Sequence, residues 1–306
     1  MMKKHYYSFS DYLKERFQEK VYKLSLSGGM TCPNRDGTIG EKGCIFCSES
    51  GSGEFCQSAA LPISEQIENA KKLVKNKTKS EKFIAYFQNF SNTYAPKEYL
   101  ESIFSEAIQN PEIVMLSVAT RPDLLGEDVI SLLQKLSKIK PVSVELGLQT
   151  IHEKTAEYIR RGYTLPVFTD AISRLKKARI ETVVHLIIGL PFETDADIIK
   201  SAEFVGKSGA DGVKFHCLYV SKGTDLETEF NEGKVPYLTL EKYAEILAEC
   251  IRVLPPQMVV HRITGDGAKK DLISPLWSAD KKRVLNYINR YFDEISLSQG
   301  EKYKSR

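Results

Sequence analysis

Short β-rich runs alternate with amphipathic helical segments over the first two thirds of the sequence, and this alternation constrains the fold more than any other feature. The β-rich runs lie at residues 22–29, 83–89, 113–120, 143–149, 181–190 and 212–220. Between them, apolar residues recur three and four positions apart, as one buried helix face requires, at 97–108, 127–139, 166–178 and 195–209. A strand and then a helix, repeated roughly every 30 residues, predicts a parallel α/β sheet with right-handed crossovers, open or curled into a barrel.

The regular alternation of predicted strands and helices ends after Val220. A polar stretch at 221–237 reads as a loop, and it is followed by a helical pattern at 238–254, a β-rich run at 257–265 and a second helical pattern at 279–292. We therefore predict three parts, which are an N-terminal helical extension (1–20), a barrel (21–222) and a small C-terminal α+β cap packed on the barrel (223–306).

Composition excludes several classes of protein. The chain has 306 residues, of which 42% are hydrophobic and 27% charged, as in an ordinary globular protein. No run approaches about 18 consecutive apolar residues and the N-terminus lacks a signal-peptide core, so we expect a cytoplasmic protein that does not span a membrane. A net charge of +3 is too small to prove an anionic partner.

Four of the six cysteines lie within 25 positions, which indicates a metal site rather than a disulfide framework. Eleven residues separate Cys32 from Cys44, and two separate Cys44 from Cys47. A structural zinc ion takes four protein ligands, whereas an iron-sulfur cluster held by three thiolates keeps one iron open. Two alternatives follow: a cluster on Cys32, Cys44 and Cys47, or a four-thiolate zinc knuckle that also includes Cys56.

Polar residues occur near the end of each later predicted strand. In parallel α/β folds, working residues lie at the carboxyl ends of the strands and in the loops that follow. The cysteine stretch follows the first predicted strand, as this rule requires. We expect one rim to collect Gln88, Asn89, Thr120, Arg121, Glu145, Gln149, His185, His216 and Tyr219.

The sequence Cys44-Ile45-Phe46-Cys47 resembles the cluster loop of the radical S-adenosylmethionine (SAM) superfamily. That superfamily most often has three residues between its first two cysteines, and longer spacings occur in the subgroup that resembles the catalytic subunit of the elongator complex. Further motifs resemble the YhcC/YtqA-type family of that subgroup, to which MnmL-type tRNA-modifying proteins belong. These motifs are TRPD (120–123), ELGLQ (145–149), RRGYT (160–164), HLIIGLPFET (185–194) and HRITGDGAKKDLISPLWS (261–278).

The resemblance implies a partial (β/α)6 TIM-like barrel with a small cap, a [4Fe-4S] cluster on Cys32, Cys44 and Cys47, and bound SAM. It also implies one-electron cleavage of SAM to a 5′-deoxyadenosyl radical, with an electron donor such as flavodoxin or ferredoxin. The implied substrate is tRNA, with conversion of the 5-carboxymethylaminomethyl group of a wobble uridine towards aminomethyl.

Several residues suit contacts with SAM. Gln88 and Asn89 place a side-chain carbonyl and exposed backbone where the methionine ammonium needs acceptors. Glu145 is suited to accept ribose hydroxyls, and Gln149 lies two alternations further along the same strand face. Because Glu145 would be costly to bury unpaired, we expect a ligand or an arginine beside it.

Arg161 is the candidate fork for the methionine carboxylate, with Arg160 and Arg121 as competitors. Gly189 lacks a Cβ, so the backbone there could approach the adenine closely.

The catalytic candidates are Cys56, His185, His216 and Tyr219. Cys56 follows a glycine-rich flank, and its thiol either acts on the substrate or has a structural role. His185 is either a catalyst or a hydrogen-bonded core histidine. His216 and Tyr219 face opposite ways on a regular strand, so at most one should point at the substrate. Cys217 and Cys250 fit small core positions.

Basic residues outside the predicted core bear on the substrate. The first group, Lys71, Lys72, Lys75, Lys77 and Lys79, fits a solvated helix face. The second comprises Lys269, Lys270, Lys281, Lys282 and Arg283, with Arg262 and Trp277 nearby, as a structured RNA would need for phosphate contacts and base stacking. The remaining alternatives are a radical SAM enzyme acting on a small metabolite or peptide, and a zinc-stabilised RNA-binding protein.

Overall fold

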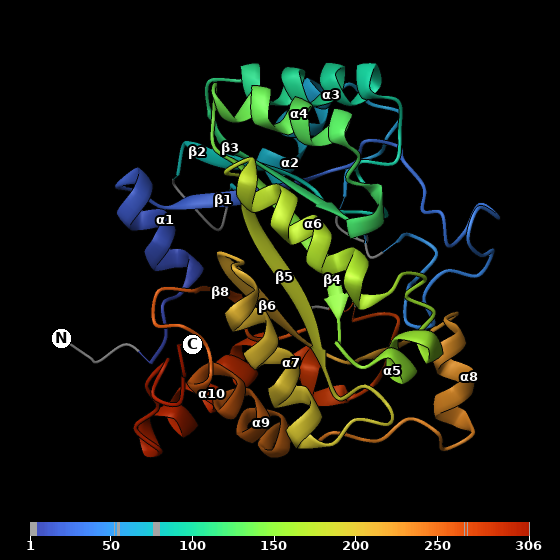
Figure 1. Cartoon of the computed structure of the whole chain (residues 1–306), viewed down its shortest axis with the longest axis vertical. Coiled ribbons are helices and arrows are strands. Elements are labelled where there is room, and N and C mark those ends of the chain that lie inside the picture. Colours follow the sequence, from blue (N-terminus) through green and yellow to red (C-terminus); the bar gives the residue numbers. More distant parts are fainter. Residues whose placement is uncertain are drawn as a thin grey trace.

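The computed structural model describes residues 5–51, 53, 56–75, 80–265, 267 and 269–305. A seven-stranded sheet with the order β1-β2-β3-β4-β5-β6-β8 forms its centre, and every neighbouring pair is parallel. The sheet curls into the partial barrel that the sequence predicts (Figure 1). Its strands are β1 (Val21–Leu26), β2 (Lys82–Phe87), β3 (Ile113–Thr120), β4 (Val142–Gln149), β5 (Glu181–Ile188), β6 (Gly212–Cys217) and β8 (Val259–Arg262).

Helices cover the outer face of this sheet. Figure 1 shows α3 and α4 along one side and α7, α9 and α10 along the opposite side, with α6 between the two groups. Their bounds are α1 (Phe9–Phe17), α2 (Ile63–Val74), α3 (Lys97–Gln109), α4 (Glu127–Ser137), α5 (Glu153–Tyr158), α6 (Leu165–Lys177), α7 (Asp195–Ser208), α8 (Asp225–Asn231), α9 (Leu240–Arg252) and α10 (Lys281–Glu294). Two short strands, β7 (Val220–Ser221) and β9 (Leu272–Ser274), form a separate antiparallel pair.

Local sequence signals account for the element ends. At α7, the Thr194 side chain accepts a hydrogen bond from the Asp197 amide and the Asp197 carboxylate accepts one from the Thr194 amide, which is a complete capping box. The same helix stops at Gly209, whose φ of 90° is a left-handed conformation that glycine adopts without a Cβ clash.

Aromatic side chains fill the space between the sheet and its helices. Phe104 of α3 is fully buried and meets Phe87 of β2 edge to face, with ring centroids 5.0 Å apart. On the opposite flank Tyr243 of α9 is also fully buried, and its hydroxyl donates to the Ile263 carbonyl at 2.8 Å. Large buried rings thus fix α3 and α9 in place on the two flanks of the barrel.

The predicted strand at 257–265 is not confined to a cap. It forms β8, which extends the barrel by pairing with β6, with Gly212 opposite Val259 and Lys214 opposite Arg262. The N-terminal helix is attached to the same strand, because the Val260 amide donates to the Tyr7 carbonyl at 2.9 Å. Segments from both ends of the chain therefore complete the barrel.

Two further details differ from the predictions. The stretch 221–237 contains helix α8, in which Leu226 is fully buried, rather than only a loop. The strand predicted at 212–220 ends at Cys217. Among the described residues, no helix combines the length and the apolar character that crossing a bilayer requires.

Phe104→Ala should lower the free energy of unfolding by about 3–5 kcal/mol, because it removes a fully buried ring from a packed interface. Leu73→Ala is the matched control, since Leu73 is 63% exposed and should change stability by less than about 0.5 kcal/mol. Urea denaturation followed by circular dichroism measures both. Equal losses in the two variants would contradict the packing described here.

Candidate active site

A cavity of about 1410 Å³ opens at the carboxyl ends of the barrel strands. Cys32, Cys44 and Cys47 line it. Nearly all of the polar residues expected at the rim line the same cavity: Gln88, Thr120, Arg121, Glu145, Gln149, His185, His216 and Tyr219. Asn89 lies outside this lining, and its amide Nδ2 donates to Ser27 Oγ at 2.9 Å. The structure therefore assembles one site from residues that are far apart in the sequence.

The cysteine loop follows β1 and is held in shape by polar contacts. Asn34 is buried, and its Nδ2 donates to the Arg160 carbonyl at 2.7 Å. Arg35 holds the other end of the loop by donating to the Cys47 carbonyl at 2.8 Å. A Cβ at Gly162 would lie 2.4 Å from Asn34 Oδ1, so only glycine lets the loop after α5 approach this closely.

The three thiols suit an iron-sulfur cluster. Burial, together with charge repulsion from the neighbouring Cys47 and Cys32, raises the pKa of the Cys44 thiol to about 12. An iron-sulfur cluster would offset this repulsion, and Cys32, Cys44 and Cys47 would hold it through their thiolates.

The zinc alternative requires a different arrangement. In the part of the chain that the structure describes, no group of three or more His, Cys, Asp or Glu side chains is placed to hold one metal ion, and this includes the four-cysteine set. Cys56 lies apart from the cavity lining, at the end of β1, where its Sγ is 3.8 Å from the Leu26 carbonyl.

Glu145 of β4 accepts hydrogen bonds from five side chains in the barrel. Its Oε1 accepts from Lys23 Nζ at 2.5 Å and from Ser117 Oγ at 3.0 Å. Its Oε2 accepts from Tyr86 at 2.9 Å, from His185 at 2.8 Å and from Lys214. The expected partner is therefore present, but it is two lysines rather than an arginine. Because both oxygens are engaged by protein donors, the ribose-acceptor role expected for Glu145 does not fit.

This network sets the charge states at the barrel floor. Burial alone would raise the pKa of Glu145, but Lys214, Lys23 and His185 outweigh it and hold that pKa well below its usual range. Burial and the Lys214 charge, against the opposing effect of Glu145, lower the pKa of His185 from 6.5 to about 4. Burial, together with the electrostatic effects of His185, Arg262 and Lys214, holds the pKa of His216 well below its usual value.

Arg161 lines the cavity, but its guanidinium is not free to bind a carboxylate through two hydrogen bonds. Its Nη1 donates to the Thr150 carbonyl at 2.7 Å and its Nε to the Tyr163 carbonyl at 2.9 Å. Its Nη2 lies 3.2 Å from Glu153. The guanidinium thus ties the end of β4 to α5, which corrects the role expected for it.

The two competing arginines are also engaged. Arg121 pairs with Asp123 through two hydrogen bonds of 3.0 and 2.8 Å, and its Nη1 donates to the Arg161 carbonyl. Arg160 donates to Asp225 at 2.5 Å. Of the two, only Arg121 lines the cavity, and its positive charge opposes the rise in the pKa of Cys44.

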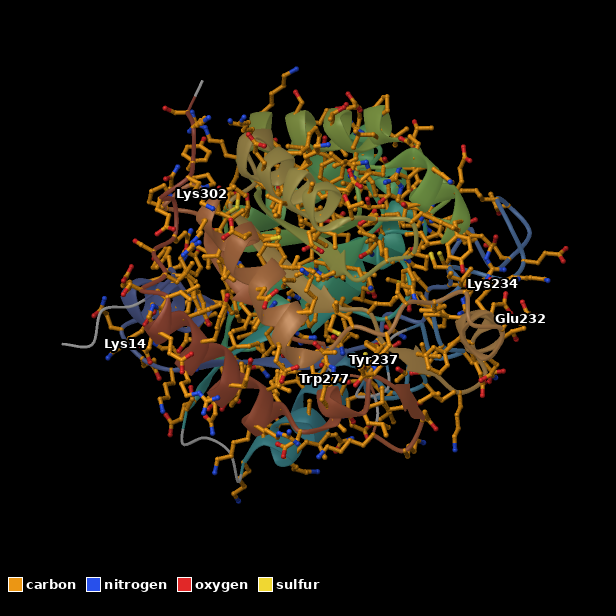
Figure 2. The ribbon with its side chains drawn as sticks, turned by 90° about the horizontal axis from the view of Figure 1, so that it is seen from below. Lys14, Glu232, Lys234, Tyr237, Trp277 and Lys302 are labelled. Carbon is orange, nitrogen blue, oxygen red and sulfur yellow. The ribbon has the colours of Figure 1, made fainter. Side chains whose placement is uncertain are left out.

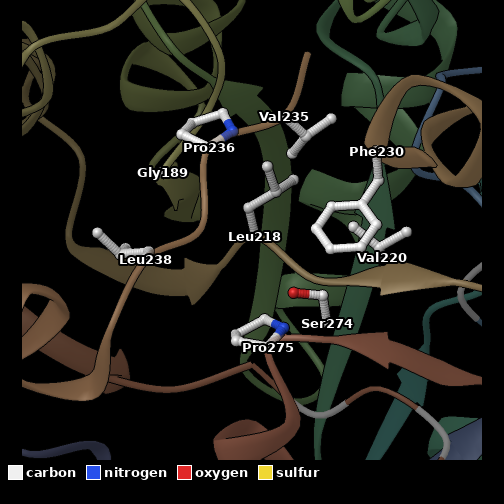
Figure 3. Close-up of a pocket in the computed structure, with 9 residues that line it drawn as sticks. All are labelled: Gly189, Leu218, Val220, Phe230, Val235, Pro236, Leu238, Ser274 and Pro275. Atoms are coloured by element: carbon white, nitrogen blue, oxygen red, sulfur yellow. The ribbon is translucent and has the colours of Figure 1, made fainter. Parts of the chain in front are cut away.

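Gly189 is not among the residues that line the large cavity. It lines a small apolar pocket of about 10 Å³ with Leu218, Val220, Phe230, Val235, Pro236, Leu238, Ser274 and Pro275 (Figure 3). A pocket of this size is no larger than one water molecule requires, so it cannot hold an adenine ring. Gly189 has a φ of 99°, and an added Cβ would lie 3.2 Å from Leu238. A glycine at position 189 therefore allows this backbone conformation beside Leu238.

The expectation that His216 and Tyr219 face opposite ways is wrong. Both line the cavity, because β6 ends at Cys217 and the strand alternation does not continue to Tyr219. The His216 ring lies 5.2 Å from that of His185, and its buried Nε2 has no hydrogen-bond partner among the described residues. Cys250 is fully buried, as predicted, whereas Cys217 is buried and also borders the cavity.

The basic groups differ in their surroundings. Lys269, Lys270 and Lys281 line the cavity. Lys71 pairs with Glu68 and Glu112 on the helical surface, and Lys77 and Lys79 lie outside the described residues. Trp277 lies beside the segment that contains Tyr237 (Figure 2) and donates its indole N–H to the Leu238 carbonyl at 2.8 Å.

Three cavity or floor residues were missed from the sequence: Lys23, Tyr86 and Lys214. A charged residue inside an apolar strand is a signal that was available for Lys23 and Lys214. Because burying a lone ammonium is costly, each lysine implies a carboxylate on another strand, and Glu145 is that carboxylate.

Comparison with known proteins gives two matches along the chain. Residues 32–205 match the Radical SAM superfamily and residues 210–294 match the Radical_SAM C-terminal domain. The chain is 38% identical over 298 residues to protein YtqA of Bacillus subtilis (strain 168), which covers 97% of this chain and 92% of that protein.

Two further relatives are more distant. The tRNA uridine(34) acetyltransferase of Methanocaldococcus jannaschii is 30% identical over 156 residues, which covers 50% of this chain and 28% of that protein. The solved structure of Methanocaldococcus infernus Elp3, with residues 1–46 deleted, matches with a TM-score of 0.68 at 18% identity, covering 91% of this chain and 64% of that chain. At this identity the structural match shows the fold.

The low pKa of His185 predicts a pH-dependent stability. The unfolded chain takes up a proton near pH 6.5, whereas folded His185 does so only at about 4, so stability falls as the pH drops from 6.5 towards 4. His185→Gln keeps a donor for Glu145 but cannot titrate. Between pH 7 and pH 5 it should lose roughly 1–2 kcal/mol less stability than the wild type in urea titrations. Parallel pH profiles would contradict this assignment.

Proposed function

The chain belongs to the radical SAM superfamily, within its YhcC/YtqA-type family, and from this premise we propose that it modifies the wobble uridine of tRNA. Enzymes of this superfamily use a [4Fe-4S] cluster and SAM, which together supply a 5′-deoxyadenosyl radical for hydrogen abstraction. The proposed conversion takes a 5-carboxymethylaminomethyl side chain towards aminomethyl. The proposed location is the cytoplasm, with flavodoxin or ferredoxin as the electron donor.

We assign the following roles to residues of this chain. Cys32, Cys44 and Cys47 would hold the cluster. Gln88 and Gln149, at the ends of β2 and β4, present polar side chains to the same cavity and are our candidates for contacts with SAM. Proton transfer to or from the substrate would fall to His185, His216 or Tyr219, which line the cavity outside the cysteine loop.

One observation carries the RNA part of the proposal: the cavity that contains the three cysteines also has a basic lining. Among the described residues that line it, nine are lysine or arginine and three are aspartate or glutamate. Such a balance favours a polyanion, and RNA phosphates provide one. The relative named tRNA uridine(34) acetyltransferase supports the same substrate class.

Cys44→Ala should reduce iron from about four atoms per chain to a small remainder, because a cluster cannot stay attached through two thiolates in an open cavity. Anaerobic reconstitution followed by iron analysis and absorption spectroscopy measures this. Cys250→Ala is the matched control, since Cys250 is buried in α9 outside the cavity lining and should leave the iron content unchanged. Full iron content in Cys44→Ala would refute the ligand assignment.

Deleting the gene should change the wobble-uridine profile of cellular tRNA, with the 5-carboxymethylaminomethyl nucleoside rising and the aminomethyl nucleoside falling. Nucleoside mass spectrometry of total tRNA measures both. Restoring the wild-type gene should reverse the change, and restoring Cys44→Ala should not. An unchanged profile in the deletion strain would remove wobble uridine as the substrate.

A further inference from the structure

An exposed tyrosine and an exposed leucine lie on two segments that pack against each other. Tyr237 is 60% exposed and Leu276 is 71% exposed. Segments 235–238 and 274–275 contribute to the lining of the small apolar pocket (Figure 3), and Leu276 directly follows the second of them. Single exposed apolar side chains are normal, whereas exposed apolar side chains on adjoining segments indicate a contact surface. We call Tyr237 and Leu276 the 237–276 surface.

The backbone on both sides of Tyr237 is fixed. Val235 is buried in an apolar cluster, and the Leu238 carbonyl accepts a hydrogen bond from the Trp277 indole N–H at 2.8 Å. The Trp277 ring packs on that of buried Tyr243, with centroids 5.5 Å apart. Trp277 therefore supports the surface, and Tyr237 beside it presents the more exposed ring (Figure 2). A ring on a fixed backbone loses little conformational entropy when it binds a partner.

The 237–276 surface borders the large cavity. Leu276 begins the short 3₁₀ helix η2 (Leu276–Ala279), and Ser278 and Ala279 at its other end line the cavity. Four residues of a 3₁₀ helix span roughly 6–8 Å, because each residue adds about 2.0 Å. This length is the rise of about two stacked nucleotides at about 3.4 Å each. A strand that enters the cavity over η2 therefore passes the 237–276 surface within about two nucleotides.

Basic side chains follow this surface along the chain. Lys281 lines the cavity, and the next two residues, Lys282 and Arg283, are exposed. Among the described residues, neither Lys282 nor Arg283 has an ion-pair partner, because Asp280 accepts from the Arg283 amide and not from its guanidinium. The surface thus combines an exposed aromatic ring with cationic side chains. A single-stranded RNA offers the complementary groups, which are unstacked bases and a chain of phosphates.

We propose that Tyr237 stacks on an unpaired base of the RNA substrate, within about two nucleotides of the one in the cavity, while Lys282 and Arg283 contact phosphates. This inference rests on the proposed function, because it takes the substrate to be RNA. Every base has a flat aromatic face, so such stacking strengthens binding without selecting a sequence. The 237–276 surface thus holds the RNA loop outside the cavity while the reacting nucleotide lies inside it.

The test uses the reconstituted protein and anticodon stem-loop RNAs that carry 2-aminopurine at one unpaired loop position at a time. Stacking quenches the fluorescence of this base, so an anaerobic titration gives both the affinity and the stacked position. Tyr237→Leu keeps an apolar side chain but removes the ring, so it should weaken binding about tenfold and abolish the quenching at one loop position. Tyr237→Trp keeps an aromatic face and should retain both the affinity and the quenching.

Lys282→Gln should weaken binding and lower its salt dependence by about one phosphate contact. Lys14→Gln is the matched control, because Lys14 lies on α1, away from Tyr237 (Figure 2), and should leave binding unchanged.

Unchanged affinity and quenching in Tyr237→Leu would overturn the stacking role while leaving the proposed function intact. A concentration-dependent dimer that Tyr237→Leu abolishes in analytical ultracentrifugation would assign the 237–276 surface to a second copy of the chain, which also overturns it. If the wild type binds none of the RNAs, the RNA part of the proposed function fails, and this inference fails with it.

Discussion

The barrel depends on one buried carboxylate. Glu145 of β4 accepts hydrogen bonds from side chains on each of the other strands from β1 to β6. A parallel sheet is otherwise held by contacts between neighbouring strands, so a group that links β1 directly to β6 fixes the curvature of the whole sheet. Losing such a group would leave two ammonium groups buried without compensation, at a cost of about 3–5 kcal/mol.

The same network decides which end of the barrel is open. Lys23 extends from β1 towards Glu145 and lies over the rings of Tyr86 and Phe9, 4.3 and 4.9 Å from their centroids. Phe9, from α1, stacks on His261 of β8 with centroids 4.0 Å apart. The N-terminal helix therefore packs beside β1 and β8, and the described cavity opens at the carboxyl ends of the strands, where the cysteine loop lies.

Sequence patterns predicted the strand positions and the polar rim, because both follow from residues that are close together in the sequence. β3 matches its predicted range, and the polar rim forms as expected because parallel strands bring their carboxyl ends to one edge. The partners of Glu145 could not be predicted, because Lys214 and Lys23 are 69 and 122 positions away in the sequence. The alternation of apolar residues within a strand does not show which other strands lie beside it. The roles expected for Arg161 and Gly189 failed for a related reason: motif position places a residue near the site but does not show which neighbours already occupy its hydrogen bonds.

The charged side chains in the cavity lining are not evenly paired. Near the cysteine loop, Arg121 is paired with Asp123 and Arg161 lies 3.2 Å from Glu153. After β8, Lys269, Lys270 and Lys281 add basic side chains to the lining. On the proposed function, these basic side chains would attract the phosphates of an RNA substrate towards the cavity.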